Sequence, residues 1–334
     1  MSRPAASTGD IRPSLLETGL DWADPALSPA ALRTGKLCFA GEDGVLPYLE
    51  SRRLWLGFGE PLAPPSRRPR LLRAFFAAAR SSGRSAAVMP VGPSLAATLG
   101  RSLFLGESGT LDLRGFCLRG NRRKTVRQSV SRMERQGYRF HLLGPPHGAD
   151  VVSDLRTVSD AWLVTKRVPE NRAVLGWFED SETAASRVAM VLAPGGSAEA
   201  FATLYPVEGG AGLDLLRRRP GCPSGTMDLL VAGVAHGLRA EGYRRLELGL
   251  APGTSGGRPV PRMVRAVAWV AGRRSWYGCE GLRRFKNKFR PVWTPRYAVY
   301  RTPADLVEAF RMTTGIVLSR GGSGAGSKDR HRAA

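Results

Sequence analysis

The stretch from Ser186 to Arg219, SRVAMVLAPGGSAEAFATLYPVEGGAGLDLLRRR, contains three consecutive segments that read as β-strands. Gly and Pro residues separate three apolar runs, which is typical of strands and the turns between them. Strands that follow one another through short connections pair antiparallel. The stretch therefore predicts antiparallel pairing in the second half of the chain.

The residues that follow predict a different kind of pairing. SGTMDLLVAGVAHGLRAEGY (224–243) reads as a helix and RRLELGLAP (244–252) as a strand. A strand, a helix and a further strand in this order favour parallel pairing. Both kinds of pairing together exclude a doubly wound fold, so we predict an α/β protein with a mixed sheet of the acetyltransferase type.

The first half of the chain has a similar texture. Strand-like segments at 36–40, 52–59 and 85–92 flank a helix at 67–83, whose apolar face contains Leu72, Phe75, Phe76 and Ala79. We therefore predict two tandem acetyltransferase-like domains, at 33–148 and 149–316, with the catalytic site in the second. Residues 1–32 are expected to form an irregular arm, and the Gly- and Ser-rich residues 317–334 a disordered basic tail.

The composition points to a polyanionic partner. The net charge is +22, which favours nucleic acid or an anionic membrane surface as partner, although a general bias toward arginine is an alternative explanation. The cysteines are scattered, so we expect no metal site. No signal peptide or membrane span is evident, and we expect a cytoplasmic protein, at most peripheral to the inner face of the membrane.

Two stretches concentrate the positive charge. RGNRRKTVRQSVSRMER (119–135) has seven basic residues and one acid, and GLRRFKNKFRPVWTPRYAVY (281–300) has six basic residues and no acid. Phosphate would relieve the like charges, and aromatic side chains among cations can stack on bases; a solvated helix face is the alternative. We expect Phe285 and Phe289 to face the core, and Lys286, Lys288 and Arg290 to face away from it.

Asp228 lies in the first turn of the helix that Gly225 and Thr226 open, with Thr226 as the predicted N-cap. Two roles are open for this carboxylate. It stabilises the helix dipole, or it binds an ammonium group or takes a proton. The chain has no P-loop and no GxSxG motif, and RRPGCP, RAEGYR and RSSGRS only approach the turn that binds the pyrophosphate of coenzyme A.

DLLRRRPGCPSGTMDLL and EGYRRLELGLAP, followed by WYGCEGLRRFKNKFRPVWTPRYAVY, closely resemble the C-terminal domain of phosphatidylglycerol lysyltransferases. RKTVRQSVSRMERQGYRF, SDAWLVTK and GWFED add to the resemblance, which covers about 119–300. It implies tandem acetyltransferase-like folds that move an amino acid from aminoacyl-tRNA to a hydroxyl, without a cofactor. We expect direct attack, because no Ser or Cys has a neighbouring base.

The segments that carry this resemblance supply the candidate site. The catalytic candidates are Asp228, Lys286 and Arg296. The substrate-binding candidates are Gly225, Thr226, Met227, Gly249, Asp160, Trp177, Tyr277 and Phe285. The tRNA-binding candidates are Arg119, Arg122, Arg123, Lys124, Arg127, Arg283, Lys288 and Arg290.

Two departures from the family bear on the substrates: the first leaves the acceptor open, and the second leaves the fit of the amino-acid pocket open. Family members commonly carry transmembrane helices before this domain, and RVPENRAVLGWF lacks the Ser that tends to precede the Leu-Gly pair. The acceptor is thus a phosphatidylglycerol headgroup or a soluble small molecule, as in antibiotic biosynthesis. An acyl-coenzyme A transferase and a non-catalytic RNA- or membrane-binding module are the alternatives. The amino acid and the oligomeric state remain open.

Overall fold

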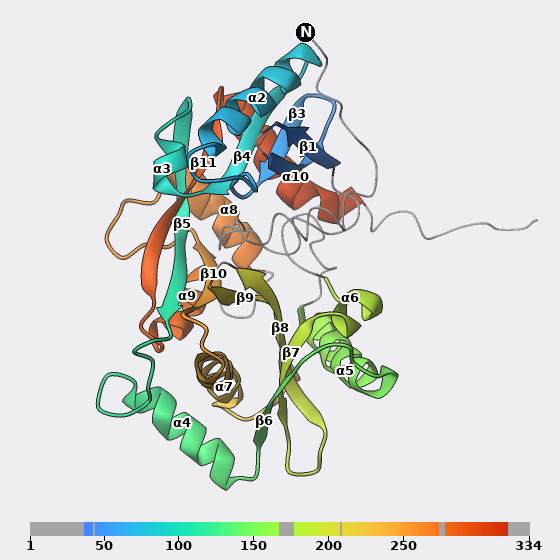
Figure 1. The fold of residues 1–334 in the computed structure, drawn as a ribbon, viewed down its shortest axis with the longest axis vertical. Helices are drawn as coiled ribbons and strands as arrows, with labels where there is room; N and C mark the ends of the chain where they lie inside the picture. Colours follow the sequence, from blue (N-terminus) through green and yellow to red (C-terminus); the bar gives the residue numbers. More distant parts are fainter. Residues whose placement is uncertain (1–36, 43, 167–176, 208, 274–277, 320–334) are drawn as a thin grey trace, which may run out of the picture.

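The computed structural model describes residues 37–42, 44–166, 177–207, 209–273 and 278–319 (Figure 1). The first half contains β1 (Leu37–Gly41), β2 (Gly44–Glu50), β3 (Leu54–Phe58), α2 (Arg68–Ser81), β4 (Ser85–Val91), α3 (Pro93–Ala96) and β5 (Arg101–Asp112). The middle contains α4 (Lys124–Arg135), β6 (Arg139–Leu143), α5 (Ala149–Lys166) and α6 (Asp180–Ala184). The second half contains β7 (Arg187–Leu192), β8 (Ala198–Val207), β9 (Gly210–Arg218), α7 (Thr226–Ala240), β10 (Arg245–Pro252), α8 (Arg262–Arg273), α9 (Gly278–Asn287), β11 (Val292–Tyr300) and α10 (Pro303–Ser319).

The strands form one 11-stranded sheet in the order β1-β2-β3-β4-β11-β5-β10-β9-β8-β7-β6. β7, β8 and β9 pair antiparallel, and β9 pairs parallel with β10 after the α7 crossover. The predicted mixed sheet is therefore confirmed. The predicted arm lies outside the described residues, and the predicted tail overlaps the end of α10, which extends to Ser319.

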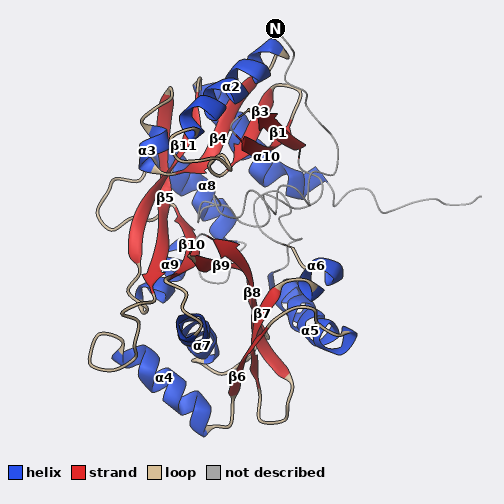
Figure 2. Ribbon diagram, viewed as in Figure 1, coloured by secondary structure: helices blue, strands red, loops and turns tan. Residues whose placement is uncertain are grey.

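The same connectivity occurs twice. In the first half β1, β2 and β3 pair antiparallel, and α2 leads to β4, which pairs parallel with β3. The next strand of each half pairs with the other half: β5 with β10, and β11 with β4. β5 and β11 then pair with each other at the centre of the sheet (Figure 2). The two halves thus exchange strands, an arrangement that the order of segments along the chain did not predict.

Helices cover both faces of each half of the sheet. In the first half, α2 packs Leu72, Phe75 and Phe76 on one face, and α10 packs on the other. In the second half, α4 and α7 cover the face of Ala189 and Val191, whereas α5 covers the opposite face. The predicted apolar face of the helix at 67–83 is confirmed, because all its named residues are buried. Among the described helices, none combines the length and the apolar character that a membrane crossing needs.

Because each half contains a strand that pairs with the other half, we expect the molecule to unfold in one transition. Phe75 is fully buried, so Phe75→Ala should reduce the free energy of unfolding by about 3–5 kcal/mol. Val307, with 59% of its surface exposed, is the control, and Val307→Ala should change stability by less than about 0.5 kcal/mol. Hydrogen exchange tests the coupling: Phe75→Ala should also accelerate exchange of β8 amides, and unchanged β8 protection would show that the halves unfold separately.

Candidate functional site

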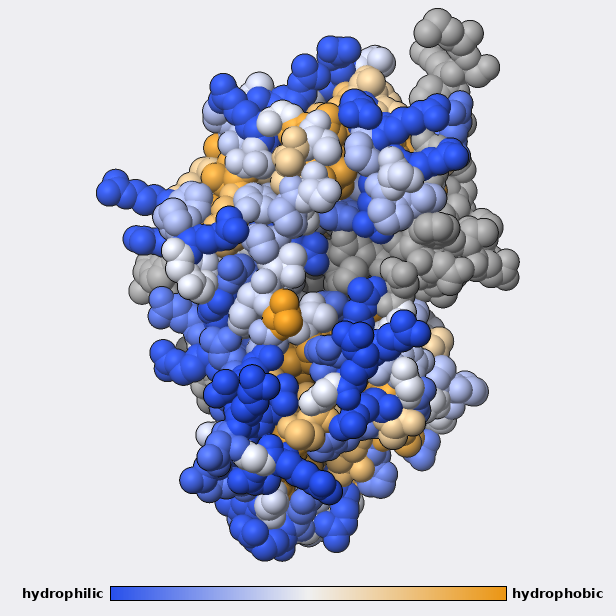
Figure 3. Space-filling model, turned by 60° about the vertical axis from the view of Figure 1, so that its left-hand side comes forward, coloured by the Kyte–Doolittle hydropathy of each residue, from blue (hydrophilic) through white to orange (hydrophobic). Residues whose placement is uncertain are grey.

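The two basic stretches meet in space. The Arg123 Nε donates a hydrogen bond to the Phe289 carbonyl oxygen at 2.9 Å, and the Arg290 Nε donates to the Arg122 carbonyl oxygen at 2.8 Å. The start of α4 and the turn between α9 and β11 therefore form one surface, which we call the basic junction (residues 119–127 and 288–290). In Figure 3, hydrophilic side chains dominate the lower end of the molecule, which is the end that carries α4.

The cations of this region fall into two groups. Arg119, Arg122 and Lys124 are exposed, and their side chains have no hydrogen-bond or ion-pair partner among the described residues. Arg123 and Arg127 are half-buried and donate to backbone carbonyl oxygens, those of Cys117 and Phe289 and those of Leu118 and Gly120 respectively. The first group is available to an external phosphate, whereas the second stabilises the loop before α4.

Asp228 is only 2% exposed, in the first turn of α7. Both of its carboxylate oxygens accept hydrogen bonds from the Lys288 Nζ at 2.9 Å. Asp228, predicted to be catalytic, and Lys288, predicted to bind tRNA, thus form one ion pair. The predicted N-cap was wrong: Gly225 is the N-cap, with a φ of 108° that favours glycine, and the Thr226 hydroxyl donates to the Pro223 carbonyl oxygen instead.

Lys286 was expected to face away from the core, but it is buried, with 6% of its surface exposed. Its Nζ donates to the carbonyl oxygens of Gly249 at 3.0 Å and Leu250 at 3.1 Å. Burial disfavours the charged form and lowers the pKa of Lys286 to about 7. This amine can therefore hold or release a proton near neutral pH.

The irregular course of β10 creates this environment. β10 pairs with β9 only from Arg245 to Glu247, and its register with β5 shifts between Glu247 and Leu250. Gly249 lies in the shift with a φ of 77°, a conformation that L side chains rarely adopt. The shift brings two successive carbonyl oxygens toward α9, where Lys286 binds them.

Polar side chains gather beside Lys286, at the pairing of β5 with β11. Glu107 is buried and accepts from the Arg283 Nη2 at 2.6 Å and from the Gly256 amide at 3.1 Å. The Arg296 side chain is also buried, and its Nε lies 3.3 Å from the Ser108 hydroxyl. Arg283 stacks over Trp293 at 4.1 Å. Arg283, a predicted tRNA ligand, thus makes internal contacts in this structure.

A cavity of about 580 Å³ adjoins this cluster. It lies between α8, α9 and the loop after β10, and its polar lining is Thr254, Ser255, Arg258, Arg265, Glu280, Arg283, Arg284 and Asn287. Arg265 and Arg284 are exposed and have no ion-pair partner among the described residues. The sequence did not indicate Glu107, Arg258 or Arg265 as site residues. Only for Glu107 is there a local signal, because it is an acidic residue within a largely apolar strand.

The remaining candidates lie apart or have structural contacts. Met227 packs against the core, and Phe285 and Phe289 face it as predicted, with ring centroids 5.6 Å apart. Asp160 is exposed on α5, which covers the face of the sheet opposite Asp228. Trp177 is buried. Tyr277 lies outside the described residues.

Comparison with known proteins gives consistent matches. Residues 24–300 match the family profile described as phosphatidylglycerol lysyltransferase, C-terminal. The phosphatidylglycerol lysyltransferase of Bacillus subtilis (strain 168) is 29% identical over 303 residues, which cover 87% of this chain and 35% of that protein. The bifunctional lysylphosphatidylglycerol biosynthesis protein of Rhodococcus opacus (strain B4) is 27% identical over 89% of this chain and 28% of its own length. The chain thus spans about a third of the length of the curated relatives it matches.

Solved structures agree over nearly the whole chain. The C-terminal domain (DUF2156) assigned to a lysylphosphatidylglycerol synthetase of Agrobacterium fabrum superposes with a TM-score of 0.80 at 30% identity, covering 92% of this chain and 96% of that one. The Bacillus licheniformis protein named L-PGS gives a TM-score of 0.78 at 25% identity, covering 93% and 97%. The sequence resemblance is thereby confirmed, and this chain belongs to the family of phosphatidylglycerol lysyltransferase C-terminal domains.

Proposed function

We propose that this protein transfers an amino acid from an aminoacyl-tRNA to a hydroxyl of the phosphatidylglycerol headgroup. Relatives named phosphatidylglycerol lysyltransferase support phosphatidylglycerol as the acceptor, and the family resemblance implies aminoacyl-tRNA as the donor. The observation that carries the proposal is the buried amine of Lys286, with a pKa of about 7, in a cluster that adjoins an arginine-lined cavity. A soluble hydroxyl or amine acceptor is the second candidate, because the cavity is polar.

The donor ester supplies the driving force for this transfer. The acceptor hydroxyl oxygen attacks the ester carbonyl carbon, the bond to the ribose oxygen breaks, and the ribose oxygen takes a proton. One ester bond replaces another, so the reaction consumes no nucleotide and the proposal includes no cofactor. The protein has to align the two substrates and move one proton.

Lys286 is the proposed proton acceptor. A catalytic base works best when its pKa lies near the operating pH, and burial gives Lys286 a pKa of about 7. Arg296, buried on β11 with its Nε 3.3 Å from the Ser108 hydroxyl, is the proposed cation for the developing negative charge on the carbonyl oxygen. Asp228 remains a candidate for orienting the amino acid, but it acts together with Lys288, which already occupies both carboxylate oxygens.

The basic junction is the proposed contact surface for tRNA. Arg119, Arg122 and Lys124 are exposed, and no acidic side chain among the described residues pairs with them, so their positive charge is available to phosphate. Acyl-coenzyme A fits the structure less well as donor. The start of α7, a position suited to phosphate, already holds the ion pair of the buried Asp228 carboxylate with Lys288. A non-catalytic RNA- or membrane-binding module is the remaining alternative, and it predicts no transfer from any donor.

We also infer two tandem acetyltransferase-like units that exchange strands. The repeated connectivity, three antiparallel strands followed by a helix and a parallel strand, supports this division. The boundary at residue 148 stays a prediction. β6, which precedes this residue, pairs with β7, which follows it, so hydrogen bonds of the sheet cross the predicted boundary. Both substrates place the proposed reaction in the cytoplasm, at the inner face of the membrane.

The transfer itself is tested with radiolabelled aminoacyl-tRNAs, supplied with phosphatidylglycerol vesicles or with a water-soluble metabolite extract. We expect label to move from one aminoacyl-tRNA into the lipid fraction. Label in a soluble product would identify the second candidate acceptor. Transfer from acyl-coenzyme A instead, or no transfer from any donor, would contradict the proposed function.

Lys286→Arg separates two roles of this residue, because arginine keeps the positive charge but cannot accept a proton. If Lys286 is the base, transfer by Lys286→Arg and Lys286→Met should fall by about 100-fold or more, and the wild-type rate should rise with pH up to about 7 and then level off. Normal transfer by a folded Lys286→Arg variant would assign the residue to charge stabilisation alone.

Stability gives an independent check of the same pKa. The unfolded lysine keeps its proton up to about pH 10.5, whereas the folded lysine loses it at about 7. Between these values the unfolded state binds more protons, so the wild-type free energy of unfolding should rise with pH, by at most about 1.4 kcal/mol per pH unit. Lys286→Met should lack this contribution in urea titrations from pH 6 to 10.

For the basic junction, Arg122→Ala should weaken tRNA binding and make the slope of log affinity against log salt less steep by about 1. Arg52, exposed in the turn between β2 and β3, is the matched control, and Arg52→Ala should leave that slope unchanged. Arg123→Ala should instead lower the melting temperature, because it removes hydrogen bonds to two backbone carbonyl oxygens. If Arg122→Ala binds tRNA with the wild-type slope, the junction is only a solvated surface.

A further inference from the structure

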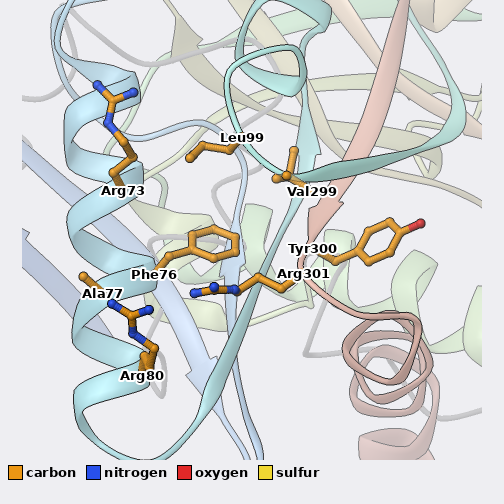
Figure 4. Close-up of a pocket in the computed structure, with 9 residues that line it drawn as sticks. Arg73, Phe76, Ala77, Arg80, Leu99, Val299, Tyr300 and Arg301 are labelled. Atoms are coloured by element: carbon orange, nitrogen blue, oxygen red, sulfur yellow. The ribbon is translucent and has the colours of Figure 1, made fainter.

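A second cavity, of about 320 Å³, lies far from the basic junction. It is formed by α2, the turn before β5 and the end of β11, and its lining is Arg73, Phe76, Ala77, Arg80, Leu99, Gly100, Val299, Tyr300 and Arg301 (Figure 4). In Figure 1, α2 lies at the upper end of the molecule and α4 at the lower end. This cavity plays no part in the transfer chemistry described above.

Its floor is apolar. Phe76 is 8% exposed and Val299 is fully buried, and in Figure 4 their side chains converge with that of Leu99. The ring of Tyr300 points away from them. The floor therefore offers contact area to an apolar group, whereas stacking on a nucleic-acid base would need an exposed ring, and Phe76 is only 8% exposed.

Its rim is positive. Arg73, Arg80 and Arg301 are exposed, and their side chains have no hydrogen-bond or ion-pair partner among the described residues. No acidic residue lines the cavity, and α2 contains none. Guanidinium groups with no acidic partner attract phosphate, and an apolar floor beneath them selects a phosphate that carries a hydrocarbon portion.

We propose that this cavity binds an anionic phospholipid of the membrane, with its phosphate on Arg73, Arg80 and Arg301 and the start of an acyl chain on Phe76, Leu99 and Val299. The apolar floor and the opposite position of the basic junction favour a lipid over RNA as occupant. The inference rests on the proposed function only in taking the membrane as the source of the ligand. It assigns a lipid-binding role to the first half, separate from the acceptor site near Lys286.

The test is co-sedimentation with vesicles made of equal parts phosphatidylglycerol and phosphatidylcholine, compared with pure phosphatidylcholine. The triple variant Arg73→Ala, Arg80→Ala, Arg301→Ala should lose at least tenfold in partitioning to the anionic vesicles. The matched triple Arg52→Ala, Arg139→Ala, Arg244→Ala removes the same charge from exposed positions outside both cavities, and it should lose less than threefold. Equal losses in the two triples would mean attraction by net charge alone and would overturn the proposal.

Two further measurements define the ligand. Leu99→Asp, which places a carboxylate at the apolar floor, should weaken vesicle binding as the arginine triple does, with the melting temperature as folding control. Soluble glycerol 3-phosphate should bind far more weakly than the vesicles. Undiminished vesicle binding by a folded Leu99→Asp, equal affinity for glycerol 3-phosphate, or a selective loss of tRNA affinity in the arginine triple would each contradict a lipid site.

Different results would contradict the proposed lipid site and the proposed amino-acid transfer. Lys286→Met should sediment with anionic vesicles like the wild type, because Lys286 is buried and does not line this cavity. Vesicle binding that depends on the arginine rim, in a protein that transfers no amino acid, would contradict the proposed function only. Transfer to short-chain, dispersed phosphatidylglycerol with no effect of the arginine triple on vesicle binding would contradict the lipid site only.

Discussion

The antiparallel pairing of β5 with β11 joins the two halves of this molecule. Its ladder runs from Val292 opposite Thr110 to Tyr300 opposite Arg101. β5, from the first half, also pairs with β10 of the second half, and β11, from the second half, also pairs with β4 of the first half. A sheet edge in either half is thereby covered, which removes the exposed hydrogen-bonding groups that an edge strand presents. The same ladder carries Glu107, Ser108 and Arg296 into the interior.

This ladder supplies Glu107, Ser108 and Arg296 to the polar part of the candidate site, and the helices α7 and α9 with the turn after α9 supply Asp228, Lys286 and Lys288. Buried charges are stable only when hydrogen bonds or opposite charges compensate them, and here Glu107 has Arg283 while Asp228 has Lys288. Lys286 differs because its described partners are two neutral carbonyl oxygens. Without a carboxylate to hold the proton, burial alone acts on the amine and brings its pKa to about 7. Lys288, paired with a carboxylate, is therefore a structural cation, whereas Lys286, bound only to carbonyl oxygens among the described residues, is a candidate base.

The two halves present different surfaces to large anionic partners. The basic junction has exposed cations on a helix start and a turn, the arrangement on which its proposed contact with the phosphate backbone of tRNA rests. The cavity beside α2 has cations above an apolar floor, which suits an anionic lipid. The proposed tRNA surface and the proposed lipid cavity lie at opposite ends of the molecule, so neither partner would block the other.

The sequence by itself determined the mixed sheet, the apolar face of α2, the family and the concentration of positive charge, because apolar periodicity and short motifs are local properties. It did not determine that β5 and β11 pair across the two halves, since pairing between strands far apart in the sequence leaves no local periodicity. The burial of Lys286 was missed although it lies four residues after Leu282 and three before Phe289, at the edge of the apolar stripe of α9. Only the packing of α9 against β10 decided that Lys286 is enclosed while Lys288, two residues later, reaches Asp228. The folded backbone likewise decided which arginines of the basic stretches bind carbonyl oxygens and which remain exposed, because a charge pattern does not specify its partners.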